Sequence, residues 1–334
     1  MLSMSLILII FVVASALIFD FINGFHDSAN AISTAVSTRA LTPKVAVMMA
    51  AVMNLLGAMY STGVAKTIGD DIADSKLISP EIILAAMFGA IFWNLFTWYY
   101  GIPSSSSHAL LGGIIGAVLV SSGPAALKID GILKIFKSLI FSPLMAMVLG
   151  YVIMIIFFWI FGKWSPLKIN RRFKKLQIMS AAMIAFSNGS NDAQKGMGII
   201  TLALLSGGFI SAMEVPFWVK IAASLAMASG TAIGGYRIIK TMSGKIFKLD
   251  ALSGFAADVN SSVIIFGATL LHLPVSTTHV VSCSIMGVGA AKRMNAVRWG
   301  TARKIFSAWF LTIPCSMAVG ALSYGCVELI AWIV

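Results

Sequence analysis

Apolar residues form long, nearly unbroken runs along most of this chain, instead of alternating with polar residues as they do on water-facing helices. The first run covers residues 1–21, and runs of similar length recur up to the C-terminus. A helix needs about 20 apolar residues to cross the hydrocarbon core of a bilayer. The pattern therefore predicts a protein built from several membrane-spanning helices.

Four polar motifs interrupt the apolar runs, and they form two matching pairs. Residues 23–27 (NGFHD) are similar to residues 188–192 (NGSND), which lie 165 positions later. Residues 103–108 (PSSSSH) are similar to residues 274–279 (PVSTTH), which lie 171 positions later. Two motifs that recur in the same order at nearly equal distances indicate two homologous halves.

The sequence pattern of each half predicts the same two irregular elements, an interrupted helix and a re-entrant hairpin. The first motif falls inside an apolar run, which predicts an interrupted helix. The second motif precedes a shorter apolar run, within residues 104–120 and 277–290. A helix of about 12 residues covers about 18 Å of a hydrocarbon core that is about 30 Å thick. We therefore expect each short run to form one arm of a re-entrant helical hairpin.

The composition excludes the soluble classes of protein. Hydrophobic residues make up 59% of the 334 residues and charged residues only 11%, which is far from the balance of soluble domains. The net charge of +12 resides largely in short segments without acids, such as residues 163–175 and 292–304. Basic loops of membrane proteins stay on the cytoplasmic side. The positive charge therefore indicates which loops face the cytoplasm, and no nucleic-acid partner is expected.

Equivalent loops of the two halves carry different charge. Arg39 and Lys44 make one loop basic, whereas its counterpart at residues 206–216 contains only Glu214. Residues 66–76 are acidic on balance and their counterpart at 237–250 is basic; the loop near residues 128–130 is neutral and its counterpart at 292–304 is basic. By the positive-inside rule, the halves have opposite orientations in the membrane.

The predicted fold is thus an all-α polytopic membrane protein made of two inverted-topology repeats, each with an interrupted helix and a re-entrant hairpin. Residues 1–162 form the first repeat, residues 163–176 a basic cytoplasmic linker, and residues 177–334 the second repeat. Both chain ends are expected outside the cell. Inverted repeats that meet at broken helices are typical of secondary transporters, whose substrates bind near the midplane of the bilayer.

Buried carboxylates suggest a cation site. Asp27, Asp192 and Asp258 lie deep in apolar sequence, where a charge costs about 2.5–3.5 kcal/mol or more. Asp27 could simply cap a helical segment. Its repetition at Asp192, with an asparagine four residues before each, favours oxygen ligands for a hard cation such as Na⁺. The expected Na⁺ ligands are Asn23, Asp27, Asn30, Asn188 and Asp192.

The hydroxyl-rich motifs suggest an anion site. Ser and Thr shortly after a proline are typical of helix N-termini, where free N–H groups and the helix dipole attract anions. One or two hydroxyls would satisfy the turn itself, so three or four in both copies favour a tetrahedral oxyanion. The expected phosphate ligands are Ser104, Ser105, Ser106, Ser107, Ser276, Thr277 and Thr278.

The charges of these two sites predict coupled transport. Asp27 and Asp192 would repel a bound anion by about 4 kcal/mol for each pair of charges 4 Å apart at an effective dielectric near 20. Bound cations cancel that repulsion, so anion and cations are expected to move together. Lys195 stands three residues after Asp192, where the first half has Asn30. It is expected to pair with Asp192 or Asp258, or to contact the anion directly.

With the signatures NGFHDSANA at residues 23–31 and NGSNDAQK at 188–195, both halves of the chain resemble the inorganic phosphate transporter (PiT) family. The resemblance implies symport of inorganic phosphate with Na⁺ or H⁺ by alternating access, in the cell membrane, as a homodimer and without a cofactor. His26 stands where the second signature has Asn191, so the two cation sites are not expected to be equivalent. The chain lacks a long hydrophilic central domain.

Three alternatives remain open at this point. The substrate could be sulfate or arsenate, since hydroxyls and helix ends recognise shape, and the coupling ion could be H⁺. The protein could be an anion channel. An intramembrane hydrolase could use Ser106 or Ser107 with His108 and Asp27, but catalysis needs one nucleophile and not two mirrored hydroxyl clusters. No enzyme activity and no catalytic residues are expected.

Overall fold

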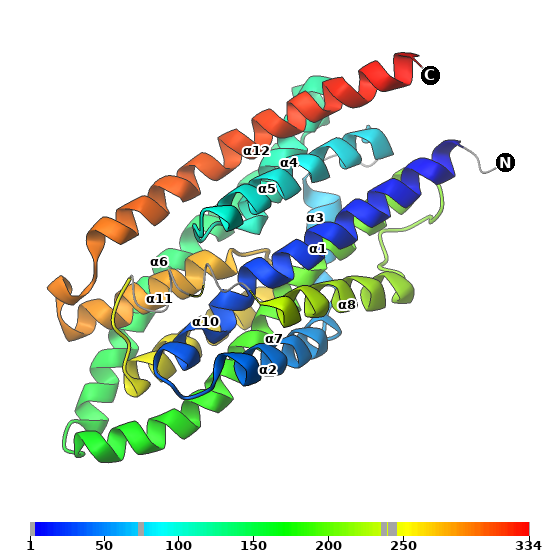
Figure 1. The fold of residues 1–334 in the computed structure, drawn as a ribbon. Coiled ribbons are helices and arrows are strands. Elements are labelled where there is room, and N and C mark those ends of the chain that lie inside the picture. Colours follow the sequence, from blue (N-terminus) through cyan, green and yellow to red (C-terminus); the bar gives the residue numbers. More distant parts are fainter. Residues whose placement is uncertain (1–3, 73–76, 235–238, 240–245, 334) are drawn as a thin grey trace.

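The computed structural model describes residues 4–72, 77–234, 239 and 246–333, and all regular structure in them is helical. The helices of these residues are α1 (Met4–Ser37), α2 (Pro43–Ala58), α3 (Gly63–Asp71), α4 (Pro80–Tyr99), α5 (Ser106–Ser121), η1 (Pro124–Ala126), α6 (Ile129–Phe161), α7 (Pro166–Ser206), α8 (Phe217–Ile233), α10 (Ala251–Leu270), α11 (Thr277–Lys292), η2 (Met294–Ala296) and α12 (Trp299–Ile333). Figure 1 shows their arrangement in an elongated bundle. The prediction of an all-helical polytopic membrane protein is confirmed.

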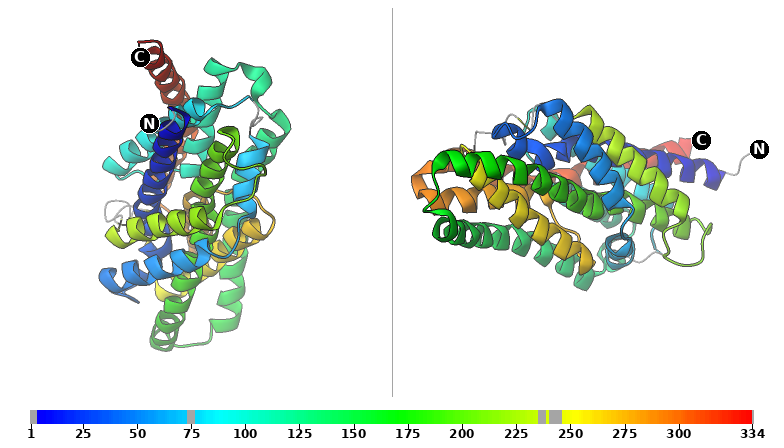
Figure 2. Two further views of the ribbon diagram at one scale, coloured as in Figure 1. Left: turned by 90° about the vertical axis from the view of Figure 1, so that its right-hand side faces the viewer. Right: turned by 90° about the horizontal axis from the view of Figure 1, so that it is seen from below.

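Five of the described helices are long and apolar enough to cross a membrane: α1, α4, α6, α10 and α12. The pair α2 and α3 would add a sixth span, bent by 67° at the break between them. Both chain ends lie at one end of the bundle, and the turn between α6 and α7 lies at the other (Figures 1 and 2). This placement agrees with the expectation that the ends and the basic segment lie on opposite sides.

The two halves of the chain pack against each other in a reciprocal way. Helix α1 packs along α8 as α7 packs along α2, and α5 packs along α12 as α11 packs along α6. In both halves the short helix, a 3-10 turn and a long helix follow in the same order. The order and the packing agree with two homologous halves. Their inverted orientation stays a prediction, and residues 73–76 and most of 237–245, used for one of the loop comparisons, lie outside the described residues.

The expected helix interruptions at the first motifs are wrong. Helices α1 and α7 run continuously through residues 23–27 and 188–192. The glycines there serve close packing instead. A Cβ on Gly24 would lie 2.1 Å from the carbonyl oxygen of Met227, and one on Gly189 would lie 2.1 Å from that of Asn54. The two aspartates of the motifs accept hydrogen bonds from Thr277 and Thr278 of α11 while their own helices stay unbroken.

The basic segment expected as a linker is largely helical. Helix α6 ends at Phe161 and α7 begins at Pro166, so the loop between them is short. Ser165 caps α7 by accepting a hydrogen bond from the backbone N–H of Lys168. The basic residues after Pro166 therefore occupy the first turns of the same helix that carries the second acidic motif.

The short helices predicted after the serine-rich motifs are α5 and α11. Each has 16 residues, and at 1.5 Å per residue this length is about 24 Å, less than the hydrocarbon core. Helix α5 packs against α4, and α11 packs against α10. Each pair thus forms a helical hairpin; its re-entry into the membrane stays a prediction.

Candidate functional site

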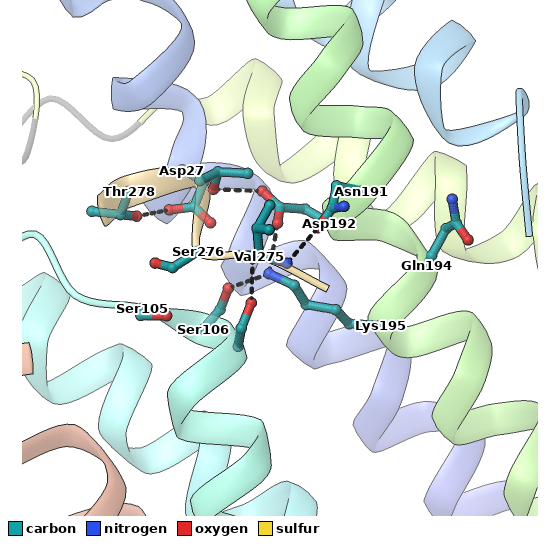
Figure 3. Close-up of polar contacts among 12 residues, drawn as sticks. Asp27, Ser105, Ser106, Asn191, Asp192, Gln194, Lys195, Val275, Ser276 and Thr278 are labelled. Carbon is teal, nitrogen blue, oxygen red and sulfur yellow. Dashed lines mark hydrogen bonds and ion pairs between the residues drawn. The ribbon is translucent and has the colours of Figure 1, made fainter. Parts of the chain in front are cut away.

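The tips of the two hairpins meet inside the protein. Ser105 and Ser276 are the N-caps of α5 and α11, and each accepts a hydrogen bond from the backbone N–H three residues later. The Ser107 hydroxyl donates to the backbone carbonyl of Val275 over 2.8 Å. The two helix N-termini predicted from the hydroxyl-rich motifs are therefore neighbours, and the structure brings these motifs together (Figure 3).

Asp27 of α1 reaches this meeting point from the first half. Its Oδ1 accepts hydrogen bonds from Thr278 Oγ1 and from Asn30 Nδ2, both at 2.9 Å. Asn30 Nδ2 also donates to Thr278 Oγ1 at 2.9 Å. Among the described residues, Asp27 Oδ2 and Asn30 Oδ1 have no hydrogen-bond partner. Two oxygens of this site therefore remain available to a ligand.

Asp192 of α7 reaches the same point from the second half. Its Oδ1 lies 2.6 Å from the ammonium of Lys195, and its Oδ2 accepts a hydrogen bond from Thr277 Oγ1 at 2.9 Å. Lys195 Nζ also donates to Ser106 Oγ at 2.9 Å. Of the partners expected for Lys195, the structure places Asp192 beside it. Asp258 lies elsewhere and accepts from Thr34 and Ser180.

One short segment of α11 holds both acids. Thr277 binds Asp192 and the next residue, Thr278, binds Asp27. The two aspartates come from motifs 165 positions apart in the sequence. Each is at most 2% exposed. The site therefore joins both halves of the chain and lies away from solvent, as a midplane substrate site requires.

Asn23 and Asn188 stand one helical turn before the two acids and are buried. Neither side-chain oxygen nor nitrogen of these amides has a hydrogen-bond partner within the part of the chain that the structure describes. Buried amides are normally hydrogen-bonded, so each such group asks for an explanation. Amide oxygens are suitable ligands for a hard cation, which fits the expectation for both residues.

One predicted phosphate ligand lies outside this cluster. The Ser104 hydroxyl accepts a hydrogen bond from Trp93 Nε1 at 3.0 Å and lies 3.1 Å from Thr312 Oγ1. These contacts fasten the base of the hairpin tip to α4 and α12. Ser105 and Ser276 are the N-caps of α5 and α11. The site is therefore lined by the backbone N–H groups at the N-termini of these two helices as well as by the serine hydroxyls.

Sequence reasoning missed two further residues at the site. Asn191 holds the tip of the second hairpin, because its amide donates to Thr269 Oγ1 and to the carbonyl of Leu273, and its Oδ1 accepts from Val275 N. The only signal was its mismatch with His26. Asp20 lies against Gly196, where a Cβ would be 2.0 Å from Asp20 Oδ2. No periodicity reveals that contact.

The chain is similar to known phosphate transporters over nearly its whole length. Residues 23–320 match the phosphate transporter family. A "Probable low-affinity inorganic phosphate transporter" of Bacillus subtilis (strain 168) is 52% identical over 322 residues, which cover 96% of this chain and 97% of that protein. A relative of the same name from Rhizobium meliloti (strain 1021) is 44% identical over 97% of this chain and 98% of its own length.

A solved structure, "The sodium-dependent phosphate transporter", has the same fold. It matches with a TM-score of 0.90 over 97% of this chain and 99% of its own, at 24% sequence identity. Because the family consists of transporters, the expectation that the chain is not an enzyme is confirmed and the hydrolase alternative is excluded. By the match over residues 23–320 and the identity to these relatives, the chain belongs to the phosphate transporter family.

Proposed function

We propose that this chain imports inorganic phosphate by symport with cations, Na⁺ first among them, through alternating access. The observation that carries the proposal is the pair Thr277 and Thr278, which brings Asp192 and Asp27 of opposite halves to one buried point. The names of the relatives, which are phosphate transporters, support the substrate. The name of the structural neighbour supports Na⁺ as the ion to test first.

The charges at the meeting point support coupling between anion and cation. Phosphate would bind against the N-termini of α5 and α11, where Ser105, Ser106 and Ser276 lie. Each unit charge of an anion 4 Å from Asp27 or Asp192 would be repelled by about 4 kcal/mol at an effective dielectric near 20. A cation at the free oxygens of Asp27 and Asn30 lowers that cost, so the anion binds best with its cation in place.

The membrane potential would then drive accumulation. Each net positive charge moved inward gains about 2.3 kcal/mol per 100 mV. A cycle that carries more positive charge on its cations than negative charge on phosphate therefore concentrates phosphate in the cell. This proposal places the chain in the cytoplasmic membrane. The homodimer implied by the family resemblance also stays a prediction, which native mass spectrometry of the purified protein tests.

Uptake of radiolabelled phosphate into proteoliposomes tests this function. The purified chain is given an inward Na⁺ gradient, an inward pH gradient or neither, in separate samples with the same phosphate concentration. We expect uptake above that of protein-free liposomes, and a several-fold stimulation by the Na⁺ gradient. Stimulation by the pH gradient alone would assign H⁺ as the coupling ion. No uptake under any gradient would contradict phosphate transport.

Two further measurements separate the remaining alternatives. An excess of unlabelled sulfate or arsenate tests selectivity; stronger competition by sulfate than by unlabelled phosphate would overturn the proposed substrate. Electrical recording from bilayers tests the channel alternative. A carrier that closes one side before it opens the other gives no single-channel steps, so unitary currents would contradict alternating access.

A further inference from the structure

Lys195 stands at the position of α7 that Asn30 occupies on α1. Both residues follow their aspartate by three positions, so on a helix each side chain lies beside that carboxylate. Lys195 is 1% exposed. A lysine is almost never buried to this degree without an anionic partner, so its place at a buried carboxylate requires a reason.

The two side chains make equivalent contacts with different chemistry. Asn30 Nδ2 binds Asp27 and the hydroxyl of Thr278 on the second hairpin. Lys195 Nζ binds Asp192 and the hydroxyl of Ser106 on the first hairpin. The asparagine is neutral and keeps a carbonyl oxygen, whereas the ammonium brings a positive charge and has no acceptor.

The oxygens of the two aspartates are consequently used in different ways. Asp192 has both oxygens bound, one by Lys195 and one by Thr277. Asp27 Oδ2 has no hydrogen-bond partner in the described part of the chain. A free cation that approached Asp192 would meet the like charge of Lys195 at ion-pair distance, and both carboxylate oxygens there already have a hydrogen-bond partner.

We propose that Lys195 is a tethered cation, which fills in the second half the position that a transported cation takes in the first half. This inference rests on the proposed function and deepens it. The second acidic motif then supplies fixed charge balance for the bound anion, and the first motif supplies the exchangeable cation. The chain carries one exchangeable cation fewer than its two acidic motifs would hold with asparagine at both positions.

A third buried carboxylate, Asp20, lies near the two acidic motifs. The test therefore compares the number of Na⁺ ions bound by different variants. Asp20 lies against Gly196, the residue that follows Lys195 in the chain. It could hold an additional ion, so the absolute number of ions bound by the natural chain does not decide the question. The change in the number of bound Na⁺ ions when Lys195 is replaced decides it.

Equilibrium binding of ²²Na⁺ to the purified full chain in detergent measures that change. Lys195→Asn reproduces the first-half residue, and we expect it to bind one more Na⁺ per chain than the natural protein. Asn30→Lys installs the tethered cation in the first half, and we expect one Na⁺ fewer. Lys134→Asn is the matched control, because Lys134 pairs with Asp71 at 2.8 Å on an exposed surface; its Na⁺ binding should equal that of the natural chain.

The outcomes separate this inference from the proposed function. Phosphate uptake is measured on the same protein preparations. A gain of one Na⁺ in Lys195→Asn supports the tethered cation even if the natural chain takes up no phosphate, which would overturn only the function. Equal Na⁺ binding by Lys195→Asn and the natural chain, with phosphate uptake intact, overturns the tethered cation. If Lys195→Asn does not fold, unchanged Na⁺ binding in Asn30→Lys overturns it as well.

Discussion

The acidic motif of the first half and that of the second half occupy equivalent places on the fold, but they differ in charge. Asp27 accepts hydrogen bonds from the neutral donors Asn30 and Thr278, and its Oδ1 lies 3.4 Å from His26 Nδ1. Asp192 forms a buried ion pair with Lys195. The helix packing around them is the same in both halves: a Cβ on Gly57 would meet the carbonyl oxygen of Phe186 on α7 at 2.0 Å, and one on Gly230 would meet that of Phe21 on α1 at 1.9 Å.

The packing of the two halves can therefore be symmetric while their charges are not. Close helix contacts and helix caps are repeated because both halves must pack alike. The charges respond instead to what each site has to hold. A symmetric frame can thus carry one fixed cation and one exchangeable cation.

Replacing each aspartate in turn should change stability and transport more than any other substitution. Asp192→Asn leaves the Lys195 ammonium buried without its ion-pair partner, and breaking a buried pair in this way costs about 3–5 kcal/mol. Asp27→Asn keeps an oxygen for Thr278 and for the nearby His26 imidazole, and it leaves no lysine without its partner, so we expect a loss of about 1 kcal/mol or less. Chemical denaturation in detergent measures both, and Na⁺-dependent phosphate uptake should be lost in both variants.

The double variant Asp192→Asn with Lys195→Met is the control for that prediction. It removes both charges together, so most of the lost free energy of unfolding should return. Equal losses of stability in the two single aspartate variants would contradict the electrostatic difference between the halves. Unchanged Na⁺ dependence of uptake in both would mean that the aspartates are only structural.

The next largest effect concerns Gly196, whose counterpart in the first half is Ala31. Gly196→Ala makes the halves alike in sequence, but the new Cβ would lie 2.0 Å from Asp20 Oδ2. We expect this overpacking to cost about 1–3 kcal/mol. Asp20→Ala introduces the residue found at the equivalent position of the second half, Ala185, and should remove the clash.

A double-mutant cycle over these two positions checks that prediction. Gly196→Ala should be much less costly in the Asp20→Ala background, with a coupling free energy of about 1 kcal/mol or more. Additive effects of the two substitutions would show that Asp20 and Gly196 do not contact. Denaturation of the four proteins in the same detergent gives the coupling directly.

Much of this comparison could be predicted from the sequence, because the information is local and duplicated. The spacing of the two NG-containing motifs predicts two halves, and the hydroxyls after Pro103 and Pro274 predict the N-termini of α5 and α11. The spacing of Asp192 and Lys195 predicts their ion pair, since residues three apart on a helix are neighbours.

The rest depends on contacts between helices that are distant in sequence. The polar first motifs within apolar runs suggested broken helices, yet the helices are unbroken and Gly24 and Gly189 allow other helices to pack closely against them. The role of Asn191 depends on where the tip of the second hairpin lies. The hydrogen bond that the Ser104 hydroxyl accepts from Trp93 likewise depends on how α4 packs against the hairpin tip. Such pairings cannot be derived from local patterns, because many partners satisfy the same pattern.

A smaller effect is expected at the two hairpin caps. Ser105→Ala and Ser276→Ala each remove an N-cap acceptor, which costs about 1 kcal/mol. Ser105 Oγ also lies 2.7 Å from His108 Nδ1, so its replacement should cost more than that of Ser276. Denaturation in detergent measures the two losses, and a larger loss in Ser276→Ala would contradict the order.

The smallest effect distinguishes the bases of the two hairpins. The second hairpin is closed by an ion pair between Asp250, before α10, and Lys292, at the end of α11. In the first hairpin the corresponding region is joined by a neutral hydrogen bond from the Ser122 hydroxyl to the carbonyl of Leu77. Both charged groups of the ion pair are partly exposed, so the pair contributes less than about 1 kcal/mol.

The pH dependence of stability tests this last difference. Partial burial raises the pKa of Asp250, but hydrogen bonds from Lys292 and Ser253 outweigh it and leave the pKa below its ordinary value. A carboxyl with a lowered pKa stabilises the folded state above the ordinary pKa, and this contribution disappears as the pH falls through the lowered value. Asp250→Asn keeps the capping oxygen, so it should be slightly less stable than the natural chain at pH 7 and equally stable well below pH about 4. A stability gap that stayed constant from pH 7 to the acid limit would show that the charge of Asp250 contributes nothing, and the two hairpin bases would then be held by neutral contacts alone.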